Sequence, residues 1–191
     1  KFSPEGGFVS YVRDDELYVF DLAAGKELKR TKGAGGTIRN ATSEFVAQEE
    51  LDRNTGYWWS ENDQLIAWTQ IDEGPVTVAE RIDINADKVV TISQRYPFAG
   101  EDNVTIKLAV SGATRGKPVW VDLGDNPDIY LARVHWSKDS KTLYVERLSR
   151  DQKRIDLLAV NPKTGASEVI VSEVSDVWVN LNNDFKALDD G

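Results

Sequence analysis

The segment 59–69 (WSENDQLIAWT) carries the pattern that decides the fold. An aromatic residue followed by Ser60 opens a polar turn, and apolar side chains then recur at the period of two that is typical of a half-buried β-strand. The same order of residue types occurs at 2–12 (FSPEGGFVSYV) and at 136–146 (WSKDSKTLYVE). Repetition of one turn–strand unit indicates a repeat architecture rather than an irregular domain.

A second element follows the first and third copies of this unit. The segments 17–25 (LYVFDLAAG) and 157–165 (LLAVNPKTG) are apolar strands that end in an Asp/Asn-x-x-x-Gly turn. Gly25 and Gly165 can take the positive φ that such a turn requires. A weaker relative covers 104–116. Short strands alternating with tight turns are typical of β-propeller blades, which contain about 40–45 residues each.

The spacing of the repeats predicts insertions. The marker serines Ser3, Ser60 and Ser137 are 57 and 77 positions apart, so both intervals exceed one plain blade. We therefore expect an all-β partial β-propeller, with roughly three to four antiparallel blades of a larger ring and one short inserted helix. An antiparallel sandwich is the alternative, but a sandwich has no reason to repeat one blade unit.

Composition excludes several classes of function. The 191 residues include no cysteine and one histidine, which excludes disulfides, thiolate metal sites and multi-histidine clusters. A formal charge of −9 disfavours nucleic acid as a partner. No apolar run reaches 18 residues, so we expect no membrane span. We expect neither a metal nor a cofactor. Because the chain lacks an initiator methionine and opens directly on a turn, we expect a segment of a larger protein.

The first interval contains a stretch unlike the rest, 42–53 (TSEFVAQEELDR). Ser/Thr precedes a run of good helix formers and Gly56 follows it, which predicts a helix over residues 43–52. The stretch has a net charge of −3, from Glu44, Glu49, Glu50, Asp52 and Arg53. Adjacent carboxylates at Glu49 and Glu50 repel each other unless a positive group lies between them, so they are a candidate clamp for a cation or an ammonium group. The alternative is a solvated acidic helix face.

Three other features have weaker functional interpretations. His135 has no histidine partner, so packing or hydrogen bonding is favoured over general-base catalysis. The segment 125–128 (DNPD) lacks the ligand spacing of a calcium loop and is interpreted as a polar turn rather than a cation site. Trp58 and Trp59 could stack on a ligand, but a role in the core where the blade begins is favoured.

The residues around the two glutamates resemble a known family. The segments 45–51 (FVAQEEL) and 56–60 (GYWWS) resemble the double-glutamate segment of dipeptidyl peptidase IV, in which aromatic-Val-x-x-Glu-Glu leads to Trp-Trp-Ser-Pro. The resemblance continues through 96–100 (YPFAG), 148–152 (LSRDQ) and 176–180 (DVWVN), as in bacterial members. It covers essentially the whole chain.

The resemblance implies a fold and a function. Family members join an eight-bladed propeller to an α/β-hydrolase domain and remove N-terminal X-Pro or X-Ala dipeptides as serine peptidases. Residues 1–191 would be part of the N-terminal propeller, and Glu49 and Glu50 would hold the free α-amino group of the peptide substrate. The parent would be periplasmic or secreted. The rival interpretation is a non-enzymatic, protein-binding propeller of the TolB-like type, which would not need the inserted Glu49–Glu50 segment.

The sequence contains no Gly-x-Ser-x-Gly nucleophile motif, and its nearest string, 165–169 (GASEV), fails at the last position. We therefore assign no catalytic residue to these 191 residues and expect the chain alone to be inactive. The catalytic α/β-hydrolase domain and the remaining blades would be its partners in the parent. Blade faces that those partners would cover should make the isolated chain self-associate.

Overall fold

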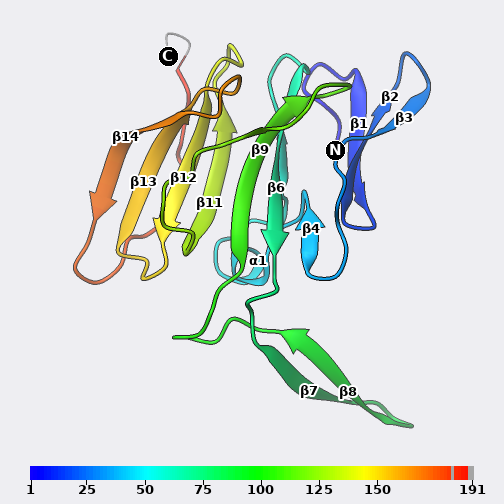
Figure 1. Cartoon of the computed structure of the whole chain (residues 1–191), viewed down its shortest axis with the longest axis vertical. Helices are drawn as coiled ribbons and strands as arrows, with labels where there is room; N and C mark the ends of the chain where they lie inside the picture. Colours follow the sequence, from blue (N-terminus) through cyan, green and yellow to red (C-terminus); the bar gives the residue numbers. More distant parts are fainter. Residues whose placement is uncertain (182, 189–191) are drawn as a thin grey trace.

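A computed structural model describes residues 1–181 and 183–188 of the chain. Three antiparallel sheets stand side by side in chain order, from blue to orange in Figure 1. The first sheet consists, in order, of β1 (Phe8–Arg13), β2 (Glu16–Asp21) and β3 (Lys26–Lys29). The third follows the same meander with β11 (Ile129–Trp136), β12 (Leu143–Ser149), β13 (Arg154–Val160) and β14 (Ser167–Val174).

The middle sheet has five strands. Its order is β10–β9–β6–β4, and β5 pairs with β6 as well. The strands are β4 (Ile38–Asn40), β5 (Tyr57–Trp59), β6 (Leu65–Asp72), β9 (Thr105–Gly112) and β10 (Val119–Trp120). Each sheet is a blade-like antiparallel unit, and the described residues form no closed sheet. The predicted all-β, partial-propeller fold is confirmed.

Both intervals between the marker serines carry an insertion, as the spacing predicts. In the first interval, the short helix α1 (Phe45–Glu49) lies between β4 and β5. In the second, a hairpin of β7 (Val78–Ile84) and β8 (Val89–Arg95) leaves the ends of β6 and β9 and projects from the body of the molecule (Figure 1). Among the described residues, no helix has the length and apolar character needed to cross a membrane.

The middle sheet is buried on both faces. Successive side chains of a strand point in opposite directions, so each strand can contribute to the core on either side. Ile66 and Trp68 of β6 join the apolar cluster shared with the first sheet, which includes Leu17. Ala67, which lies between them, and Ile71 point to the other face and belong to the cluster shared with the third sheet. A nearly continuous apolar run in β6 therefore serves two inter-sheet cores, as expected for a strand covered on both sides.

The repeated aromatic residue of the marker block joins each sheet to the one before it. The indole N–H of Trp59 donates to Ser10 Oγ at 2.8 Å, and that of Trp136 donates to the carbonyl of Trp58 at 3.2 Å. Both tryptophans are buried. The pattern repeats in the sequence because the same contact between neighbouring sheets is made twice.

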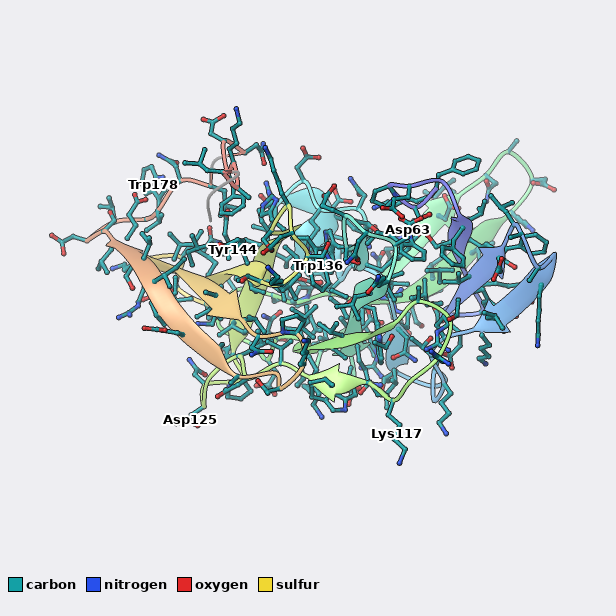
Figure 2. The ribbon with its side chains drawn as sticks, turned by 90° about the horizontal axis from the view of Figure 1, so that it is seen from above. Asp63, Lys117, Asp125, Trp136, Tyr144 and Trp178 are labelled. Carbon is teal, nitrogen blue, oxygen red and sulfur yellow. The ribbon has the colours of Figure 1, made fainter. Side chains whose placement is uncertain are left out.

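The marker turns touch one another as well. Asp63, which lies beside the first sheet in Figure 2, accepts hydrogen bonds from Ser3 Oγ at 2.5 Å and from the backbone N–H of Glu5 at 3.0 Å. Ser140, at the matching position of the third block, accepts from the backbone N–H of Asn62 at 3.2 Å. Asp63 and Ser140 have φ of 56° and 59°, so the turn geometry is shared as well.

The two Asp/Asn-x-x-x-Gly turns form as predicted. Gly25 and Gly165 have φ of 61° and 79°, in the left-handed region that glycine enters without steric cost. A Cβ on Gly165 would also lie 2.0 Å from the carbonyl oxygen of Trp120, so this turn packs directly on the middle sheet.

Candidate functional site

The segment that carries the two glutamates interrupts a strand. β4 and β5 pair with the same edge of β6, one after the other, and Thr69 lies at the junction. The N–H of Ala41 donates to the Thr69 carbonyl at 2.7 Å, and the N–H of Thr69 donates to the Gly56 carbonyl at 2.8 Å. The chain therefore leaves the sheet after residue 41 and returns at residue 56, and we call residues 42–55 the insertion.

The two ends of the insertion meet in a space that only glycine fits. A Cβ on Gly56 would lie 2.2 Å from the carbonyl oxygen of Thr42. The hydroxyl of Thr69, which is fully buried, donates to that same Thr42 carbonyl at 2.7 Å. Gly56 is thus required at the base of the insertion and not only as the stop signal of a helix.

The inserted helix is shorter than predicted. The sequence predicts a helix over 43–52, whereas α1 spans only Phe45–Glu49. Glu44 is extended (φ −76°, ψ 168°), and no side chain caps the helix at its start. After Glu50 the chain turns back through Asp52, which has φ of 51°. The prediction was wrong at both ends, because the Thr42 hydroxyl forms no hydrogen bond that could cap the helix and Gly56 lies at the base of the insertion, away from the helix end.

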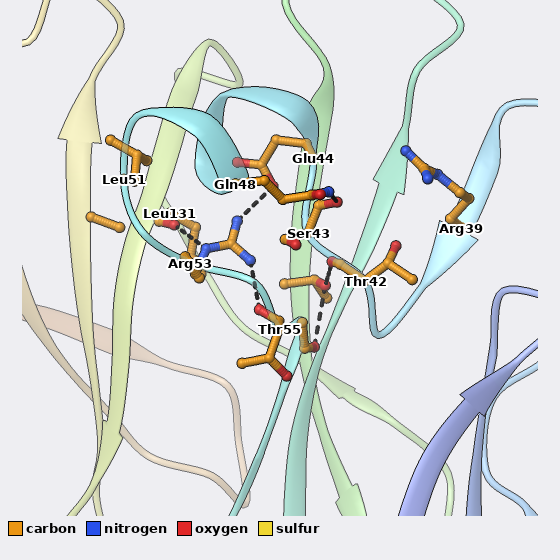
Figure 3. A network of polar contacts seen from close by, with 12 residues as sticks. Arg39, Thr42, Ser43, Glu44, Gln48, Leu51, Arg53, Thr55 and Leu131 are labelled. Carbon is orange, nitrogen blue, oxygen red and sulfur yellow. Dashed lines mark hydrogen bonds and ion pairs between the residues drawn. The ribbon is translucent and has the colours of Figure 1, made fainter.

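Glu44 and Arg53 form a buried ion pair beneath α1 (Figure 3). Arg53 Nη2 lies 2.5 Å from Glu44 Oε2, and the two side chains are 3% and 2% exposed. Arg53 also donates from Nε to the Leu131 carbonyl at 2.9 Å and from Nη1 to the Thr55 carbonyl at 3.0 Å. A solvated acidic face that includes Glu44 is therefore wrong.

The apolar side of the insertion packs on the third sheet. Ala47 and Leu51 are buried in a cluster with Tyr130. Arg133 of β11 donates from Nη1 to the carbonyl of Leu51 at 2.6 Å. Leu51, which follows Glu50, is thereby attached to the third sheet through both its side chain and its backbone.

Glu49 and Glu50 of the same segment are both exposed. Neither carboxylate forms a hydrogen bond or an ion pair with the part of the chain that the structure describes. Two adjacent carboxylates without a positive partner can accept several charge-assisted hydrogen bonds from a cationic ligand. Of the two, Glu50 lines a cleft of about 820 Å³, and Glu49 is not part of its lining.

Segments distant in sequence meet at this cleft. Its walls come from the insertion, from the turns 96–101 and 149–152, and from Asp128 and Tyr130. The ring of Phe45 contacts that of Tyr96 with centroids 5.1 Å apart. The cleft thus joins four segments that are distant from one another in the sequence.

Arg150 is a cleft residue to which sequence analysis gave no site role. It donates to the Tyr130 hydroxyl and, at 3.1 Å, to the Glu101 carbonyl, and its Nε lies 3.9 Å from Asp128. Burial raises the pKa of Tyr130, and the Arg150 charge partly offsets this. The available signals were the position of Arg150 in a polar turn between two strands and its place in the family-like segment 148–152 (LSRDQ), and neither reveals the cleft.

The other predicted features lie elsewhere. His135 stacks on Phe185 with centroids 4.5 Å apart, and burial, together with the Arg133 charge, lowers its pKa. Trp59 is buried and Trp58 packs against the core, as predicted. The turn 125–128 is closed by a hydrogen bond from the Asp128 N–H to Asn126 Oδ1 at 3.0 Å. Within residues 1–181 and 183–188, no three His, Asp or Glu side chains are grouped so that they could hold a metal ion.

Comparisons with known proteins agree with this architecture. The chain is 25% identical to the dipeptidyl peptidase 4 of Porphyromonas gingivalis, with a TM-score of 0.85 over 93% of this chain and 26% of that one. A putative dipeptidyl aminopeptidase IV from Bacteroides ovatus is 28% identical, with a TM-score of 0.78 over 94% of this chain and 24% of that one. A probable dipeptidyl-aminopeptidase B from Phaeosphaeria nodorum is 23% identical over 95% of this chain and 22% of its own length.

The chain therefore spans about a quarter of the solved structures and about a fifth of the curated relatives that it matches. All of residues 1–191 match the family described as the dipeptidyl peptidase IV (DPP IV) N-terminal region. The chain belongs to the dipeptidyl peptidase IV N-terminal region family.

Proposed function

We propose that this chain is the substrate-recognition part of a serine-type dipeptidyl peptidase that removes X-Pro or X-Ala dipeptides. In this proposal, Glu49 and Glu50 bind the free α-amino group of the peptide. The rest of the propeller and an α/β-hydrolase domain, which supplies the nucleophile, complete the enzyme. The family relationship supports the peptidase class, and the parent would act in the periplasm or outside the cell.

The chemistry of the amino group fits two carboxylates. An α-amino group has a pKa near 7.7–8.0, so it is mostly charged at neutral pH. Each charge-assisted hydrogen bond contributes about 1.5–3 kcal/mol. An internal peptide nitrogen carries no charge and would leave two carboxylates desolvated and unpaired. The same pair would therefore attract a free N-terminus and reject the interior of a chain.

The observation that carries this proposal is the contrast among the glutamates of the insertion. Glu44 is buried and neutralised by Arg53. Glu49 and Glu50 are exposed and their carboxylates unpaired, on a segment whose apolar residues Ala47 and Leu51 are packed into the protein. A segment that served only to fill space would not need to expose two adjacent like charges, one of them lining a cleft.

The direct test is Glu50→Gln in the complete protein, because glutamine keeps the shape of the side chain and removes its charge. With an X-Pro chromogenic substrate that has a free amine, kcat/KM should fall at least about 30-fold, equivalent to about 2 kcal/mol. Glu49→Gln should also lower kcat/KM. An N-acetylated substrate should be poor from the start, and the substitution should hardly change it.

Glu168→Gln is the matched control, since Glu168 is an exposed glutamate on β14 and does not line the cleft. Its kcat/KM should stay within about twofold of the unsubstituted protein. Equal, small effects of Glu50→Gln and Glu168→Gln would contradict the proposal.

The chain alone should have no peptidase activity, and turnover by a pure preparation of it would contradict the assignment of the nucleophile to another domain.

A further inference from the structure

We propose that Arg53 is a positioning residue for Glu49 and Glu50. It holds the loop so that the two carboxylates can bind the substrate's amino group. The inference rests on the proposed function. Glu44 and Arg53 flank the segment 45–52, and their ion pair closes that segment into a loop with both glutamates on it. Without this ion pair, both carboxylates would still be present and charged, but the loop would no longer hold them in a fixed position.

The guanidinium of Arg53 connects three parts of the structure. Nη2 binds Glu44 at the start of the loop, Nη1 binds the Thr55 carbonyl at the end of the insertion, and Nε binds the Leu131 carbonyl of β11. These bonds hold the start of the loop close to the end of the insertion, and they fix the loop to the third sheet (Figure 3). A planar fork with donors in fixed directions can hold three acceptors at once, whereas a lysine ammonium on a flexible stem cannot reproduce that geometry.

Apart from the packing of Ala47 and Leu51 and the bond from Arg133 to the Leu51 carbonyl, the loop has little else to hold its shape. α1 has five residues and no side-chain cap, and a helix of that length is not stable on its own. The backbone N–H of Glu50 donates to the Val46 carbonyl at 2.9 Å, and that of Arg53 donates to the Ala47 carbonyl at 2.8 Å. Glu50 therefore lies between the single helical turn and the residue that anchors it.

Stability and positioning can be separated experimentally. Breaking a buried ion pair by removing one partner leaves an unpaired buried charge, but replacing both partners by apolar residues can restore stability. Glu44→Leu combined with Arg53→Met should therefore recover much of the thermal stability that a single substitution loses. It cannot recover the hydrogen bonds to the carbonyls of Leu131 and Thr55.

The experiment measures KM and kcat for a free-amine X-Pro substrate in the complete protein, with kcat normalised by active-site titration. For Arg53→Lys and for the Glu44→Leu/Arg53→Met pair, we expect KM to rise about tenfold, with a smaller change in kcat per active site. Arg147→Lys is the matched control, because Arg147 is also an arginine bound to a carboxylate and a carbonyl, Asp156 and Leu123. It should lower the melting temperature and leave KM unchanged.

Two results would overturn the inference: an unchanged KM in Arg53→Lys, or a KM that returns to normal in the double variant together with its melting temperature. Glu50→Gln is measured in parallel. If Glu50→Gln raises KM and Arg53→Lys does not, only this inference fails. If Glu50→Gln itself leaves KM unchanged, the proposed function fails and the inference fails with it.

Discussion

Glu44 and Glu50 are six positions apart in one acidic stretch, yet their surroundings are opposite. Glu44 is nearly inaccessible and bound to Arg53, whereas Glu50 is exposed at the edge of the cleft. The difference arises from pairing, because Arg53 holds Glu44 and is itself bound to the Leu131 carbonyl of the third sheet. At the scale of single residues, burial and pairing separate structural carboxylates from those available to a ligand.

A second buried carboxylate gives a prediction about pH. Burial alone would raise the pKa of Asp156, but hydrogen bonds from Arg147, Ser172 and Arg154 outweigh burial and hold the pKa below its ordinary value. A carboxyl group with a lowered folded-state pKa adds stability above its unfolded pKa of about 3.9, and this stability is lost as the pH falls through the folded-state pKa. Asp156→Asn should cost about 2–3 kcal/mol of unfolding free energy at pH 7.

The difference between Asp156→Asn and the unsubstituted protein should shrink below about pH 4, as urea unfolding at a series of pH values would reveal. Asp87→Asn is the control, because Asp87 is exposed between the hairpin strands and should show no difference at any pH. If the difference in unfolding free energy between Asp156→Asn and the unsubstituted protein stays constant from pH 7 to below pH 4, the Asp156 charge is not what stabilises this site.

The sequence identifies the glutamate pair but not its surroundings. The segment 45–51 (FVAQEEL) marks Glu49 and Glu50 because adjacent carboxylates repel each other and because the segment matches a family motif. Nothing local predicts that Arg53 would be buried against the Leu131 carbonyl, 78 positions away. Arg150 was missed for the same reason, since its partners Tyr130 and Glu101 become neighbours only when the sheets pack.

At the scale of elements, the insertion depends on its narrow base. Gly56→Ala would place a methyl group 2.2 Å from the backbone oxygen of Thr42, which cannot move without breaking its bond from Thr69. We expect a loss of at least about 2 kcal/mol in unfolding free energy, measured by urea denaturation. Gly7→Ala is the control, because a Cβ there makes only ordinary contact, at 3.4 Å from Asp63 Oδ2. Equal, small costs for both substitutions would show that the base of the insertion can relax.

Strand and turn positions were predictable because the inter-sheet contacts repeat. The marker blocks place Trp59 and Trp136 at equivalent positions, and both donate to the preceding sheet. The helix was less predictable because a few helix formers between Ser43 and Gly56 indicate helical propensity but not length. Tertiary contacts set the length here, as Glu44 and Arg53 pair with each other instead of extending α1.

At the scale of the whole molecule, the middle sheet is covered on both faces and the outer ones are not. β14, at one edge of the molecule in Figure 1, exposes Val169, Ile170, Val171 and Val174 by 43–67%. A row of apolar side chains along an uncovered strand favours pairing with another molecule. We expect the isolated chain to self-associate in a concentration-dependent way, as measured by light scattering. Val171→Lys combined with Val174→Lys should weaken this association, and a chain that stays monomeric at high concentration would contradict the prediction.

Calorimetric titration of the complete protein would show whether Glu49 and Glu50 recognise a charged N-terminus. The ligands are an X-Pro dipeptide product with a free amine and its N-acetyl derivative, which differ in that charge. We predict that the free-amine dipeptide binds at least about 30-fold more tightly, and that Glu50→Gln reduces this ratio to about threefold or less. If Glu50→Gln leaves this ratio unchanged, the amino group is recognised elsewhere and the roles of Glu49 and Glu50 proposed above are wrong.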